Sequence, residues 1–275
     1  MLKLLCETNL IQGLKIKNPL KDLIARLSLF ADDMAIFLSE CNSTNILFEL
    51  LDRWCLASGA RFNKDKTIII PAGHIEYRWR VIESHSLSND SNQTIPESIR
   101  ILNDGESIRY LRAEIGNKIS NNDPWPQITE NIEKSLKTWE KAFPGIKGCK
   151  HIIQMIIGGK TQYITAAQSM PDQYMNILMK RIRSFLWNSE AIPAVATELL
   201  SELLSQGSRK ILNLKARNEA INIRKIRKIL DYSANRPLAS DVAMTIIAKT
   251  LPKSITEKLL GDDPSQDIFL QSIYY

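Results

Sequence analysis

Two short apolar runs enclose a pair of adjacent carboxylates in the segment Arg26–Leu38. Each run is about four to six residues long, the length of a strand rather than of a helix. A turn centred on Ala31-Asp32-Asp33 would join them into a β-hairpin with both acids at its tip. Two carboxylates so close repel each other, and a hard divalent ion such as Mg²⁺, which prefers oxygen ligands, removes that cost. The segment therefore predicts a strand pair with a metal-binding tip at Asp32 and Asp33.

An aspartate pair alone is an ordinary surface feature. The chain has a second pair, Asp262-Asp263, between a glycine and a proline, and that pair reads as a solvated loop. The apolar flanks distinguish the first pair, because they place its acids on a framework instead of a mobile loop.

A helix and a second strand are predicted to follow the hairpin. Capping residues at 42–44 and the glycine at position 59 bound the helix, which is expected to pack behind the hairpin. Apolar residues recur in it at helical spacing: Leu47, Leu50, Leu51 and Trp54. The apolar run Ile68–Ile70 then returns as a strand, with Lys66 near its start.

This order of motifs resembles the reverse transcriptases of non-LTR (LINE-type) retrotransposons, over roughly residues 5–230. In that family Phe/Tyr-Ala-Asp-Asp is the third palm motif, matched by Phe30–Asp33, and Gly-x-x-x-Asn-x-x-Lys-Ser/Thr is the fourth, matched by Gly59–Thr67. The resemblance implies that Asp32 is the principal metal ligand and that Asp33 supports it. It also implies that Lys66 contacts or protonates the leaving pyrophosphate, whereas without the family Lys66 reads equally well as a surface lysine.

The strand-like segment 108–116 resembles the fifth motif of the same family, Tyr-Leu-Gly-x-x-Ile-Gly, which holds the primer end. The resemblance implies that Tyr110 and Leu111 contact nucleic acid. Arg112 stands where the family has glycine, and glycine there lets the backbone approach closely. The residues before it, 72–106, carry glycines, a proline and a polar run, and predict a long, partly irregular surface insertion.

Three helices are predicted after a hinge at 121–126, over 128–143, over 147–167 and from Pro171 onward. The first has an apolar stripe with lysines on its other side: Ile128, Ile132, Leu136, Trp139 and Phe143, against Lys134, Lys137 and Lys141. The third has its own core stripe: Met175, Leu178, Ile182 and Phe185. Further residues match the thumb pattern of the resembled family: Trp139, Gly148, Gln162, Tyr163, Met170-Pro171 and Phe185-Leu186-Trp187.

Positive charge is concentrated in two blocks. The whole chain has a net charge of +6 and a pI near 9.1, whereas residues 134–184 and 209–228 are each far more basic than the remainder. The second block predicts a helix with Ile223, Ile226 and Leu230 toward the core. Arg217, Arg224 and Lys228 are expected on its basic face. Two basic blocks beside a suspected polymerase centre indicate a surface that binds a polyanion such as nucleic acid.

Composition excludes several classes of protein. The 275 residues are 44% apolar and 24% charged, which is ordinary for a globular protein, and no apolar run approaches the roughly eighteen residues of a membrane span. The start carries charge too early for a signal peptide, and the four cysteines and three histidines are not at zinc spacing. An intracellular protein, cytoplasmic or nuclear and not secreted, with no membrane partner and no structural zinc is expected.

The expected fold class is α+β: a partial polymerase palm with a small antiparallel sheet over 1–120, an all-α thumb-like bundle over 121–190 and a basic helical extension over 191–275. Only Glu7 and Asp22 precede the hairpin as acids, and no further carboxylate-bearing strand is recognised. We therefore expect a fragment of an RNA-directed DNA polymerase that binds Mg²⁺ or Mn²⁺ weakly and is inactive alone. Its expected partners are the RNA template and DNA primer duplex, with dNTP in the full-length family.

Two other functions remain open. The chain can be a non-catalytic nucleic-acid-binding helical module that holds a duplex backbone through phosphate contacts. It can also be a scaffold whose basic faces serve only solubility. Salt-dependent duplex binding separates these two.

Overall fold

The computed structural model describes the chain in nine stretches: residues 10–16, 23–31, 33–88, 94–120, 124–187, 195–202, 208–231, 233 and 236–250. They fall into two compact units. The terminal unit comprises the residues up to Asn103 together with those from Arg227, and the central unit comprises Asp104–Ile226. The predicted division at residues 120 and 190 follows the family resemblance and stays a prediction.

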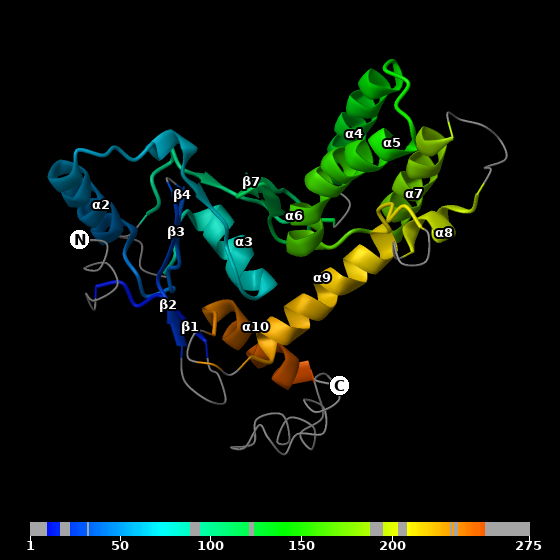
Figure 1. Ribbon diagram of the computed structural model, residues 1–275. Coiled ribbons are helices and arrows are strands. Elements are labelled where there is room, and N and C mark those ends of the chain that lie inside the picture. Colours follow the sequence, from blue (N-terminus) through cyan, green and yellow to red (C-terminus); the bar gives the residue numbers. More distant parts are fainter. Residues whose placement is uncertain are drawn as a thin grey trace. The chain divides into compact units, whose positions relative to one another are not determined.

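The predicted α+β class is confirmed, since helices and small sheets occur together (Figure 1). Every sheet in the described residues has two strands. Three pairs are antiparallel and one, β5–β6, is parallel. The pairs are β1 (Leu14–Ile16) with β2 (Leu23–Ala25), β3 (Leu27–Phe30) with β4 (Asp33–Ile36), β5 (Ile68–Ile69) with β6 (Arg100–Ile101), and β7 (Ile108–Tyr110) with β8 (Ala113–Ile115).

The predicted hairpin forms as β3–β4. Leu27 lies opposite Ile36 and Phe30 opposite Asp33, so the connection is a tight two-residue turn. Ala31, in that turn, has a left-handed backbone with φ 53°. The predicted hairpin is therefore confirmed.

Helix α2 (Thr44–Ser58) packs behind the hairpin, as predicted. Ser43 caps its start by accepting a hydrogen bond from the amide of Ile46, and Gly59, with φ 72°, ends it in the left-handed conformation that glycine adopts at least cost. Leu47 and Leu51 are buried in one apolar cluster, against which Met34 and Ile36 of the hairpin pack. A 3₁₀ turn, η1 (Lys64–Lys66), then leads into β5.

The segment 72–106 is not a surface insertion, and that prediction was wrong. It contains helix α3 (Ile75–Ser84) and strand β6, and it buries a second apolar cluster: Val81, Leu87, Ile95, Ile99 and Ile101. Its apolar residues are separated along the chain by polar ones, so no local period marks them as core. Long-range packing brings them together.

The core of the central unit is built by α4 (Trp125–Glu140), α5 (Ile146–Ile153) and α7 (Asp172–Leu186). A π-helical turn, η2 (Gln154–Gly158), joins α5 to α6 (Gly159–Gln168), so the second predicted helix is continuous across the Gly158-Gly159 step. The predicted stripe of α7 is confirmed, because Leu178, Ile182 and Phe185 are buried. The α4 stripe holds only in part: Ile132 and Leu136 are buried, whereas Trp139 and Phe143 are exposed.

Three helices follow: α8 (Thr197–Ser201), α9 (Leu214–Ile229) and α10 (Leu238–Thr250). The prediction that Ile223 and Ile226 face the core was wrong, because they are 62% and 47% exposed. Helix α9 is anchored instead by Leu214, which is fully buried, and by Arg217 and Asn218, which donate hydrogen bonds to Thr161 of α6 and to Met170.

The β7–β8 turn is strained. Leu111 and Arg112 are its two central residues, and both have positive φ, 48° and 65°. A two-residue turn of this kind favours asparagine and glycine, because a left-handed backbone costs other residues roughly 1–2 kcal/mol. Arginine occupies the position where the resembled family has glycine.

We predict that Arg112→Gly stabilises the chain by about 0.5–1 kcal/mol, since relief of the strain exceeds the extra freedom that glycine gives the unfolded state. Arg109→Gly is the matched control: the same substitution on β7, with an ordinary backbone, is expected to destabilise by about as much. Urea unfolding followed by circular dichroism measures both. Equal effects of the two substitutions would contradict the interpretation.

Candidate metal site and nucleic-acid interface

The hairpin tip presents a carboxylate to solvent. Asp33 is the first residue of β4 and is exposed, opposite Phe30, which is also exposed. Asp32, the predicted principal metal ligand, lies outside the described residues. No group of three or more His, Cys, Asp or Glu side chains is assembled in the part of the chain that the structure describes. The geometry thus places one of the two predicted ligands on a short, apolar-flanked strand.

Lys66 is exposed at the end of the η1 turn, and Asn63 organises that turn. The side-chain oxygen of Asn63 accepts a hydrogen bond from the amide of Lys66 at 3.2 Å, and its carbonyl accepts one from the Thr67 hydroxyl at 3.1 Å. The spacing Asn-x-x-Lys-Thr therefore has a local cause: asparagine caps the single turn that carries Lys66. The fourth-motif residues form one ordered turn at the start of β5.

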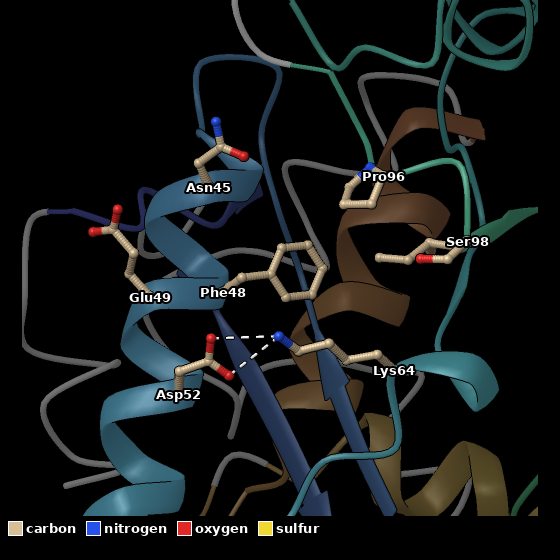
Figure 2. Close-up of a pocket in the computed structure, with 8 residues that line it drawn as sticks. Asn45, Phe48, Glu49, Asp52, Lys64, Pro96 and Ser98 are labelled. Atoms are coloured by element: carbon tan, nitrogen blue, oxygen red, sulfur yellow. Dashed lines mark hydrogen bonds and ion pairs between the residues drawn. The ribbon is translucent and has the colours of Figure 1, made fainter.

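A cavity of about 390 Å³ lies between α2, η1 and the segment before β6 (Figure 2). Phe48 points from α2 toward Pro96 and Ser98, and beneath it Lys64 pairs with Asp52 at 3.3 Å. The Lys64 ammonium lies 5.8 Å from the centre of the Phe48 ring. Both partners of the ion pair are more than half exposed, so the pair contributes little stability. No local sequence pattern predicts this pair, because its residues lie on two separate elements.

The strained β7–β8 turn is fastened to α6. Tyr163 donates its hydroxyl to the carbonyl of Leu111 at 2.5 Å. Gln168 forms two bonds with Glu114, accepting from its amide at 3.0 Å and donating to its carbonyl at 2.8 Å. Tyr110 is half-buried, and its hydroxyl has no hydrogen-bond partner within the described residues. The predicted contacts Tyr110 and Leu111 thus lie on a hairpin held rigidly against a helix.

The predicted lysines of α4 differ in their surroundings. Lys134 and Lys137 make ion pairs one helical turn back, with Glu130 at 2.6 Å and Glu133 at 3.6 Å. The hydrogen bond and charge of Lys134 hold the pKa of Glu130 below its usual value. Lys141, beyond the end of α4, is exposed and has no carboxylate partner among the described residues.

Arg181 of α7 forms ion pairs with two of the acids on α4. Its guanidinium donates to Glu133 at 2.5 Å and to Glu140 at 2.7 Å. Burial alone would lower the pKa of Arg181, but the hydrogen bonds to Glu140 and Glu133 raise it overall. Because Arg181 partly neutralises Glu133 and Glu140, these two acids offset less of the positive charge of the nearby lysines. The sequence pattern did not reveal this pairing.

Arg217 was predicted as a phosphate contact, and the structure corrects this. Its guanidinium donates to the Thr161 hydroxyl at 2.7 Å, to the Thr165 hydroxyl at 3.4 Å and to the Gly158 carbonyl at 3.4 Å. Burial lowers the pKa of Arg217. Its donors are committed inside the central unit, so its role is structural. Arg224 and Lys228, the other two predicted contacts on α9, are exposed.

We predict that Arg217→Lys destabilises the central unit by about 1–3 kcal/mol, because lysine cannot reproduce the planar fork of donors and leaves buried hydroxyls without their partner. Arg224→Lys, the matched change at an exposed arginine two turns further along α9, is expected to stay within about 0.5 kcal/mol of the original chain. Urea unfolding measures both free energies. A neutral Arg217→Lys would show that the observed bonds do not hold α9 in place.

No helix in the described residues is long and apolar enough to cross a membrane. Comparisons with models of known protein families and with curated proteins find no match for this chain. The chain's own residues therefore carry the functional argument.

Proposed function

We propose that this chain takes part in RNA-directed DNA synthesis of the LINE type, as the rear palm and thumb of a reverse transcriptase. The β3–β4 hairpin, with Asp33 exposed at its tip, is the observation that carries the proposal. Helix α2 packed behind the hairpin and the Asn63-capped turn under Lys66 support it, because a polymerase palm needs acids and a lysine on a rigid framework.

The proposed chemistry at the tip is metal binding by Asp32 and Asp33. Mg²⁺ or Mn²⁺ would orient phosphate oxygens and neutralise developing charge, and Lys66 would meet the leaving pyrophosphate of a dNTP. Two-metal transfer needs both ions bridged by several carboxylates, and this hairpin supplies two. We therefore propose weak metal binding and no primer extension by this chain alone.

The proposed role of the basic residues is to hold the template–primer duplex. Lys134, Lys137 and Lys141 on one helix, and Arg224 and Lys228 on another, would contact phosphates, which gives sequence-independent affinity. The β7–β8 turn, with Tyr110 and Leu111, would contact the primer strand. The rigid attachment of this turn to α6 supports such a role.

A second function is a nucleic-acid-binding module without catalysis. The observation in its favour is that the central unit buries a continuous core of its own, from Ile132 to Leu214, independent of the hairpin. A unit with its own core and an exposed basic surface can bind a duplex without the acids of the terminal unit.

Duplex binding is expected to be salt-sensitive. Neutralising Lys134, Lys141, Arg224 or Lys228 to glutamine should each reduce the slope of log affinity against log salt by about one, because each lost phosphate contact releases one counterion fewer. Lys64→Gln, on the η1 turn and outside the two basic blocks, is the control and should leave the slope unchanged. Fluorescence anisotropy on an RNA–DNA duplex gives the slopes. Unchanged slopes in all four variants would show that the basic faces are solvated surface only.

The hairpin is expected to bind Mn²⁺ weakly and through its own acids. Asp32→Ala should abolish the binding seen by calorimetry, whereas Asp262→Ala, in the other aspartate pair, should leave it unchanged. Extension of a primed RNA template with dNTPs and Mg²⁺ should stay at background. Tight binding that survives Asp32→Ala would refute the metal site, and extension that is lost in Asp32→Ala would refute the expected inactivity.

A further inference from the structure

The turn between α4 and α5 presents an exposed aromatic side chain that is flanked along the chain by two exposed lysines. Phe143 is 81% exposed and Trp139, before it on α4, is 41% exposed. Lys141 and Lys147 flank Phe143 along the chain, are exposed and have no carboxylate partner among the described residues. In Figure 1 this turn lies at the end of α4 remote from α6. We call residues 139–147 the α4–α5 tip.

The backbone of the tip is strained at the aromatic residue. Phe143 has φ 46°, a left-handed conformation that helix ends normally give to glycine. A bulky residue with such a φ is an outlier, and strain of this kind persists only where the surroundings enforce it.

The surroundings of Phe143 are rigid. Pro144 follows it, and Cys149 of α5 donates its thiol to the Pro144 carbonyl at 3.3 Å. Gly148 lies so close that a Cβ there would stand 3.1 Å from the Cβ of Pro144. These contacts hold the backbone that carries Phe143, and a segment ordered before binding loses less entropy when it binds.

We propose that the α4–α5 tip binds single-stranded nucleic acid, with an unpaired base stacked on Phe143 and the adjoining phosphates on Lys141 and Lys147. This proposal rests on the proposed function and extends it from the duplex to an unpaired strand. Every base has a flat face that stacks on an aromatic ring, and the lysines are complementary to the phosphates. An anionic membrane surface is the less suitable partner, because membrane docking needs a broad apolar face, whereas the apolar exposure of the tip is concentrated on Phe143, at 81% against 41% for Trp139 and 39% for Ile146.

Binding of a fluorescein-labelled oligothymidine of about twelve nucleotides to the full chain tests the proposal. Phe143→Ala should weaken it about 5- to 150-fold, the range of one lost base–aromatic stack, and leave affinity for a blunt duplex nearly unchanged. Phe143→Trp should retain the affinity, and the fluorescence it adds should be quenched by the oligonucleotide. Ile177→Ala, another exposed apolar side chain of the central unit, is the matched control and should change neither affinity.

The variant Phe143→Gly tests whether a loss of binding merely reflects a folding defect. This variant removes the ring and relieves the strained backbone, so its Tm should rise by about 2–4 °C while oligothymidine affinity falls. Unchanged affinity in Phe143→Ala, with duplex binding intact, would overturn this proposal alone. Phe143-dependent binding to phosphatidylserine vesicles, without oligothymidine binding, would overturn it in favour of a membrane contact. If the chain binds neither oligothymidine nor duplex, both proposals fail.

Discussion

The half-buried guanidinium of Arg217 is the interaction on which the placement of α9 against α6 depends. A cation half removed from water is costly unless its donors are satisfied. Here Thr161 and Thr165 donate their hydroxyls to backbone carbonyls one turn back and use the remaining lone pairs to accept from Arg217. The first helical turns of α9 must therefore lie against α6 with a polar face inward. That constraint turns Ile223 and Ile226 outward, since they lie on a different side of the helix.

Local patterns predicted the elements whose causes are local. The β3–β4 hairpin follows from two apolar runs and a tight turn, and α2 follows from its caps and from Leu47 and Leu51. The sequence could not reveal packing that joins distant residues. Val81 meets Ile95 and Ile99 only because the chain folds back, so the segment that contains them looked like surface. The apolar periodicity of α9 predicted the wrong buried face, because the hydrogen bonds of Arg217 to residues far away in the sequence determine which face lies inward.

The candidate site shows the same difference between features with local causes and features with long-range causes. Asp33 lies at a hairpin tip and Lys66 lies just before β5, as the sequence predicts, because short-range geometry fixes both. Charge alone could not distinguish Arg217 from Arg224, which lie on one helix and have opposite surroundings. Nor could it show that Arg181 engages Glu133 and Glu140, since that requires α7 to lie beside α4. Net charge identified the basic helices, whereas tertiary hydrogen bonds decide which cations remain available.

Strain argues against a purely solubilising role for the basic surface. Solubility requires charge, but it does not require non-glycine residues with positive φ. The central unit has such residues at the β7–β8 turn and at Phe143 of the α4–α5 tip. Each is held by specific contacts: Tyr163 and Gln168 fasten the first turn, and the Pro144 carbonyl fastens the second. A left-handed residue costs roughly 1–2 kcal/mol, and glycine would remove that cost. An exposed side chain kept on a costly backbone conformation, such as Phe143 between Lys141 and Lys147, suits contact with a partner better than contact with water alone.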